Sequence, residues 1–144
     1  MKSIHTEIEI NAPASKVWEI LMDFEKYPEW NPFIKSISGD AQVGGNLKVV
    51  MQQPDSKPMT FKPKCLTAEP NKEFRWMGHL FVKGIFDGEH IFKIRERDGG
   101  TTKLVQCENF NGLLLPFLWK QLNSKTISAF EQMNSALKKR AESA

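Results

Sequence analysis

The chain has 144 residues, 40% hydrophobic and 26% charged, with a net charge of +3, so residues 1–144 are expected to form one domain with a core of its own. The positive excess is mild and shows no basic stripe with interleaved aromatic residues, which argues against a nucleic-acid-binding protein. No apolar run approaches the ~20 residues of a membrane span, which argues against integral membrane association, and the chain does not open with the pattern of a signal peptide.

Residues 3–10 predict a half-buried strand, because Ile4, Ile8 and Ile10 share one face and charged residues occupy the other. Pro13 then suits the first turn of a helix. That helix has one apolar face, formed at helical spacing by Val17, Ile20, Leu21 and Phe24. It is expected to end before Tyr27-Pro28, since a residue preceding proline avoids the helical region.

The middle of the chain predicts six further strands, separated by turn signals such as Gly44-Gly45, Pro70-Asn71 and Asp98-Gly99-Gly100. Short connections of this kind favour an antiparallel meander. The expected strands cover residues 34–40, 46–53, 59–69, 72–80, 85–97 and 101–111.

A long helix is expected after Pro116, because apolar residues recur every three or four positions over 117–140 and neither Gly nor Pro interrupts them. Such a helix would be about 36 Å long, enough to cross a whole sheet. Its single apolar stripe predicts that it packs on the sheet from one side.

The turn at Asp98-Gly99-Gly100 also predicts a register for the last hairpin. Symmetric pairing about residue 99 places His90 opposite Glu108, with both side chains on one face. The opposite face is more polar, so the His90 and Glu108 face is expected to be the inner one.

The sequence favours no metal and no cofactor. Cys65 and Cys107 lack the spacing of a metal site or of a disulfide framework, and the three histidines are scattered. A reduced, cytoplasmic protein is therefore expected.

Four segments carry a family resemblance: IEINAPASKVWEILMD (Ile8–Asp23), YPEWNP (Tyr27–Pro32), GEHIF (Gly88–Phe92) and ENFNG (Glu108–Gly112). Together they resemble the polyketide cyclase/dehydrase-like branch of the START-related (SRPBCC) superfamily. The resemblance implies an α+β helix-grip fold. In that fold a seven-stranded antiparallel sheet curves around a long C-terminal helix, and two short helices lie between strands one and two.

The resemblance also implies a cavity between the sheet and the last helix, and three functions follow from it. The first is binding of a hydrophobic small molecule such as a lipid, an isoprenoid or an aromatic, polyketide-like compound. The second is a cyclase or dehydratase. The third is an interaction with a quinone-linked or ribosomal protein partner, through Leu113–Leu115 or the basic end of the last helix. A homodimer is left open.

His90 and Glu108 are the candidate catalytic residues, because an imidazole beside a carboxylate in an apolar cavity can transfer a proton. The pair could instead fix the register or bind a ligand without reaction. The inward apolar faces could line a cavity or form ordinary core. The candidate ligand-binding residues are Tyr27, Trp30, Phe61, Trp76, Phe92, Phe110, Leu122, Thr126 and Phe130.

Two segments keep a second interpretation. The aromatic segment after the first helix could form a lid or a packed plug, with Tyr27 expected at the rim and Trp30 in the core. The apolar run Leu113–Leu115 could be an exposed contact surface or a connector folded over the cavity mouth.

Overall fold

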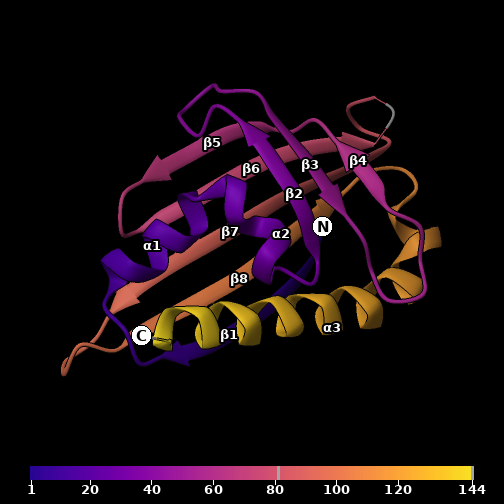
Figure 1. Ribbon diagram of the computed structural model, residues 1–144. Helices are drawn as coiled ribbons and strands as arrows, with labels where there is room; N and C mark the ends of the chain where they lie inside the picture. Colours follow the sequence, from indigo (N-terminus) through magenta and orange to yellow (C-terminus); the bar gives the residue numbers. More distant parts are fainter. Residues whose placement is uncertain (81, 144) are drawn as a thin grey trace.

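The computed structural model describes residues 1–80 and 82–143, which form two sheets and a set of helices (Figure 1). The first part of the chain contains β1 (Lys2–Ile10), α1 (Ala14–Met22), the 3₁₀ turn η1 (Phe24–Lys26), α2 (Tyr27–Trp30), β2 (Ile34–Gly39), β3 (Leu47–Met51) and β4 (Met59–Phe61). The second part contains β5 (Lys64–Glu69), β6 (Glu73–Leu80), β7 (Phe86–Glu96), β8 (Thr102–Asn111) and α3 (Leu115–Glu142).

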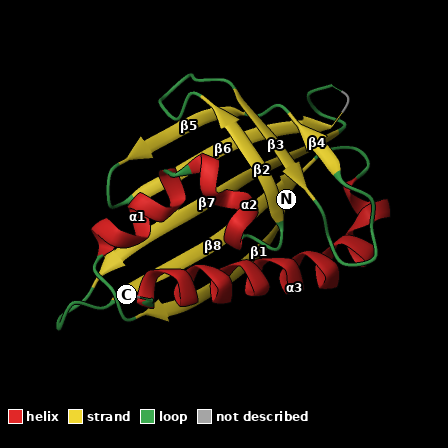
Figure 2. Cartoon of the chain, in the orientation of Figure 1, coloured by secondary structure: helices red, strands yellow, loops and turns green. Residues whose placement is uncertain are grey.

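The larger sheet has the strand order β1-β8-β7-β6-β5, and the smaller one has the order β2-β3-β4. All strand pairs are antiparallel. Figure 2 shows that the helices and the smaller sheet cover the same face of the larger sheet. This α+β arrangement, with a long C-terminal helix against an antiparallel sheet, confirms the predicted fold class.

The strand count differs from the prediction, because the expected strand 59–69 is divided into β4 and β5. Pro63 lies at the break, and a proline has no N–H to offer a ladder. The two sheets stay connected there by hydrogen bonds, from the Leu47 N–H to the Pro63 carbonyl at 2.9 Å and from the Cys65 N–H to the Gly45 carbonyl at 2.8 Å. The described residues therefore contain eight strands in two linked sheets instead of seven in one.

The predicted register of the last hairpin is confirmed, with His90 paired to Glu108 and Phe92 to Gln106. Gly99 and Gly100 both have positive φ, +84° and +79°, a conformation that glycine adopts without strain. His90, Phe92 and Gln106 are all 0% exposed, so their face is the inner one, as predicted.

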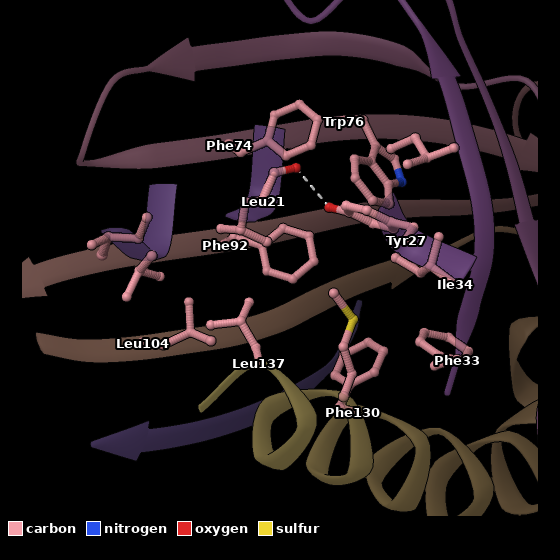
Figure 3. Close-up of a cluster of buried hydrophobic side chains, with 14 of the residues drawn as sticks. Leu21, Tyr27, Phe33, Ile34, Phe74, Trp76, Phe92, Leu104, Phe130 and Leu137 are labelled. Atoms are coloured by element: carbon pink, nitrogen blue, oxygen red, sulfur yellow. Dashed lines mark hydrogen bonds between the residues drawn. The ribbon is translucent and has the colours of Figure 1, made fainter. Parts of the chain in front are cut away.

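The core lies between the larger sheet, α1, α2 and the C-terminal half of α3. In Figure 3 Phe92 from β7, Phe130 from α3 and Phe74 from β6 point into one shared interior. Phe130, Met133 and Leu137 follow one another along α3 at helical spacing and are 0% exposed. This half of the helix thus holds it on the sheet.

The aromatic segment after α1 differs from the prediction. Tyr27 is 0% exposed, whereas Trp30 is only partly buried. The expectation of Tyr27 at the rim and Trp30 in the core was therefore wrong. The reason is that the Tyr27 hydroxyl donates a hydrogen bond to the Leu21 carbonyl at 2.8 Å (Figure 3), so the polar end of the ring is satisfied inside the core.

The ends of the helices are close to those predicted. α1 ends at Met22, before Tyr27-Pro28 as predicted. The stated reason was wrong, because Tyr27 precedes a proline yet has helical backbone angles and begins the next helical turn, α2, with Pro28 in its first turn. α3 begins at Leu115 with Pro116 in its first turn. None of the helices in the described part of the chain is both long and apolar enough to cross a membrane.

Candidate ligand pocket

A pocket of about 330 Å³ lies between the N-terminal half of α3 and the ends of the strands that face it. That volume is at the lower end of the range for small-molecule sites. The side chains around it are mostly apolar. Its principal apolar lining residues are Phe33, Met51, Met59, Phe61, Trp76, Phe86, Phe110, Leu118 and Leu122.

The structure divides the predicted ligand-binding residues into two groups. One group lines the pocket and comprises Phe61, Trp76, Phe110, Leu122 and Thr126, together with Glu108. The other group does not line it: Phe92, Phe130 and Tyr27 are fully buried in the core, and Trp30 borders a separate shallow depression beside Arg140. Whether any of them contacts a ligand stays a prediction.

The pocket mouth is formed by the loop 52–58 and by α3. The Gln53 side-chain amide donates a hydrogen bond to the Thr126 hydroxyl at 3.0 Å and so ties the loop to the helix. Lys57 from the loop and Lys125 from α3 also line the pocket and are exposed. Within residues 1–80 and 82–143 neither lysine has a carboxylate partner, so the mouth carries two positive charges that no ion pair neutralises.

His90 lies behind the pocket wall, where it is 0% exposed. Its ring stacks on Trp76 with centroids 4.8 Å apart, and the rings of Phe92 and Phe130 lie 4.8 and 4.9 Å away. Its Nδ1 atom is 3.4 Å from Glu108 Oε1, and its Nε2 atom is 2.9 Å from Gln106 Oε1. His90 therefore forms the boundary between the core and the pocket, and Glu108 stands between it and the cavity.

A buried chain of hydrogen bonds determines which nitrogen of His90 carries a proton. The Thr6 hydroxyl donates to the Gln106 backbone carbonyl at 2.7 Å, so its oxygen must accept from the Asn134 amide at 2.9 Å. Asn134 then presents its oxygen to the Gln106 side-chain amide, 2.7 Å away. Gln106 in turn presents its oxygen to His90, so Nε2 of the imidazole is the donor.

The other nitrogen of His90 has no hydrogen-bond partner among the described residues, although it is buried. This nitrogen lies 3.4 Å from Oε1 of Glu108, so the imidazole and the carboxyl group face each other. The pair borders the cavity through Glu108, which lines the pocket.

Gly88 makes room for this carboxyl group. It pairs with Phe110 across the β7–β8 ladder and lines the pocket. Oε2 of Glu108 lies so close to Gly88 that a Cβ atom at this position would clash with it. A side chain at position 88 would therefore displace the carboxyl group from the pocket wall.

Sequence reasoning missed Thr6, Gln106 and Asn134 as parts of the site. All three are nearly or fully buried, at 7%, 0% and 2% exposed. A polar residue at an inward position of a strand or on the apolar stripe of a helix was the available signal, because buried polar groups need partners. The partners themselves could not be read from the sequence, since they lie on three distant elements.

Metal and thiol chemistry find no support in the described part of the chain. It contains no group of three or more His, Cys, Asp or Glu side chains that could hold a metal ion. Burial raises the pKa of the Cys65 thiol and of the Cys107 thiol, which keeps both protonated at neutral pH.

Comparison with known proteins identifies the family. The model of the family described as "Polyketide cyclase / dehydrase and lipid transport" matches residues 1–142. The chain belongs to this family. The resemblance seen in the sequence is thereby confirmed. A comparison with curated proteins found no significant match.

Solved structures of related fold include enzymes and a START superfamily protein. The ZhuI aromatase/cyclase from Streptomyces sp. R1128 superposes with a TM-score of 0.80 at 16% identity, over 98% of this chain and 93% of that one. A START superfamily protein from Mycobacterium smegmatis gives a TM-score of 0.75 at 22% identity, over 97% of both chains. At such identities the likeness establishes the fold alone.

Proposed function

We propose that the protein binds a hydrophobic small molecule, such as a lipid, an isoprenoid or an aromatic, polyketide-like compound, in the pocket between the sheets and α3. The observation that supports this function is the pocket of about 330 Å³ with its mostly apolar lining. A cavity of this kind, with a few polar groups at fixed places, is the usual form of a small-molecule site.

The proposal can be tested by filling the pocket. Leu122 lines it from α3 and is partly buried, so Leu122→Trp should occupy the cavity without removing a hydrogen bond. The probe is anilinonaphthalene sulfonate, an apolar anion whose fluorescence rises in apolar surroundings. We expect Leu122→Trp to weaken binding of the dye at least tenfold, with the helical circular dichroism unchanged.

The matched control is Ser128→Trp, which adds the same ring at an exposed position of α3 outside the pocket lining. Dye binding that is equal in both variants would reject the pocket as the binding site. Native mass spectrometry of the freshly purified protein, followed by extraction, would identify any small molecule that it carries.

The second candidate function is a cyclase or dehydratase that uses His90 and Glu108 for proton transfer. The observation that favours it is the Glu108 carboxyl group at the pocket wall, backed by His90 Nδ1 at 3.4 Å. Acid–base catalysis by one positioned group contributes about 10²–10⁴-fold. With the compound identified by extraction as substrate, His90→Gln should lose turnover by about 10²-fold or more if the pair is catalytic, whereas a protein that only binds would keep its affinity within a few-fold.

The remaining expectations are proposals on narrower support. A cytoplasmic location agrees with Cys65 and Cys107 being free thiols. A protein partner would have Leu113 and Phe117 to contact, since they are 72% and 81% exposed. Pull-down of a stable partner by the intact protein, and its release by Leu113→Asp, would support that role.

A further inference from the structure

The polar groups of the pocket differ in kind between its wall and its mouth. At the wall stands Glu108, whose side chain is 15% exposed. At the mouth stand the exposed lysines Lys57 and Lys125. These groups restrict the chemistry of a ligand more narrowly than the apolar lining does, because each must find a complementary partner when the pocket is filled.

The Glu108 side chain offers the ligand a hydrogen-bond acceptor. Its Oε1 atom lies 3.4 Å from His90 Nδ1 without forming a hydrogen bond to it. Its Oε2 atom lies against Gly88, and both residues line the pocket. The lone pairs of Oε2 are therefore available to a donor on the ligand.

Because the Glu108 carboxyl group is largely buried, its free acceptor affects which ligands the pocket can bind. Within the described residues no side chain or backbone group donates a hydrogen bond to the Glu108 carboxyl group. A ligand that filled the pocket with hydrocarbon alone would remove water from Oε2 and give nothing in return, which is unfavourable. A ligand hydroxyl would restore the lost bond.

The mouth of the pocket favours an anionic group on the ligand, whereas the wall favours a hydrogen-bond donor. Lys57 and Lys125 are two cations, whereas Glu108 is the single acidic residue of the pocket lining, and the one acidic residue of the loop 52–58, Asp55, does not line the pocket. A ligand anion is attracted there and a ligand cation is repelled. The donor that reaches Glu108 is thus expected on a neutral group, such as a hydroxyl, and not on an ammonium.

We propose that the ligand is an apolar carboxylic acid that carries a neutral hydrogen-bond donor, its hydroxyl reaching Glu108 and its carboxylate reaching the lysines of the mouth. This inference rests on the proposed binding function and specifies its ligand class. Ligands that lack the hydroxyl fill the same space but leave Oε2 without a partner.

The test is displacement of anilinonaphthalene sulfonate by matched probes. Hydroxynaphthoate carries both groups, methoxynaphthoate has its donor blocked, and naphthol lacks the carboxylate. Hydroxydecanoate and decanoate are a second pair with and without a hydroxyl, and their flexible chains let the hydroxyl and the carboxylate adopt different separations. We expect each hydroxyl-bearing acid to bind about tenfold or more tightly than its partner without a donor, because a buried acceptor left without a hydrogen bond costs about 1–3 kcal/mol.

Variants test whether Glu108 causes the preference for hydroxyl-bearing acids. Glu108→Leu should abolish the preference for the hydroxyl and leave binding of decanoate intact or tighter. The matched control is Glu89→Gln, on the opposite face of β7, where Glu89 pairs with Arg75 and should not affect selection. Gly88→Ala, which keeps the carboxyl group but displaces it, should reduce the preference in part, so the test does not depend on Glu108→Leu alone.

The lysines are tested by the double variant Lys57→Gln/Lys125→Gln, which should weaken both acids relative to naphthol. Lys120→Gln is the control, because Lys120 is exposed on α3 outside the pocket lining. If the dye binds but hydroxylated and blocked probes displace it equally, the ligand class is wrong while the binding function stands. If the dye itself does not bind, both are overturned.

Discussion

Replacing Asn134 by leucine should destabilise the protein through the buried hydrogen-bond chain and not through packing. Asn134 is 2% exposed, accepts from Gln106 at 2.7 Å and donates to Thr6 at 2.9 Å. Leucine is close to asparagine in shape but leaves the Gln106 amide with only a 3.4 Å contact to the Phe130 carbonyl. One buried donor without a good partner costs about 1–3 kcal/mol.

The assay is equilibrium unfolding in urea, with the free energy of unfolding expected to fall by about 1–3 kcal/mol at an unchanged dependence on urea. Asn123→Leu is the control, since Asn123 lies on the same helix, is partly exposed and forms no side-chain hydrogen bond within the described residues. Surface changes of this kind stay within about 0.5 kcal/mol. Equal stability of the two variants would refute the chain of donors that assigns the proton of His90 to Nε2.

Two further predictions concern the aromatic segment and the pocket mouth. Burial raises the pKa of the Tyr27 hydroxyl far above its ordinary value, so above pH ~10 only the unfolded chain ionises, and stability should fall by about 1.4 kcal/mol per pH unit. Tyr27 is the one tyrosine of the chain, so its phenolate absorbance should appear only on unfolding. A phenolate signal from the folded protein would contradict the burial. Tyr27→Phe should remove this dependence of the free energy of unfolding on pH. Gln53→Ala should speed release of anilinonaphthalene sulfonate about 2–10-fold in stopped flow by removing the bond to Thr126, and an unchanged rate would show that this bond does not hold the mouth.

The hairpin carrying His90 and Glu108 could be predicted because its determinants are local. Asp98-Gly99-Gly100 specifies a turn, and the alternation of residues on either side specifies the faces. Together they place His90 opposite Glu108, as the structure does. The break at Pro63 was equally local, and the missing N–H of proline was the signal that was overlooked.

The boundary between core and pocket could not be predicted from the sequence. Phe92 and Phe110 both lie on inward faces of the same hairpin, and an apolar side chain at such a position looks the same in either setting. The structure buries Phe92 against Phe74 and places Phe110 in the pocket lining. What separates them is how far the smaller sheet and α3 stand from the larger sheet at each point, which depends on contacts between distant segments.

The two halves of the long helix contact different parts of the molecule. Its C-terminal half places Met133 and Leu137 in the core at 0% exposed, whereas its N-terminal half gives Leu118 and Leu122 to the pocket. His90 and its partner Gln106 contact the C-terminal half, through Phe130 and Asn134. The packing of the C-terminal half already holds the helix on the sheet. The N-terminal half therefore does not need to pack tightly against Trp76 and Glu108, and a cavity remains beside them. A fold that keeps the core and the pocket apart in this way can change the side chains of the pocket at little cost to the rest of the structure.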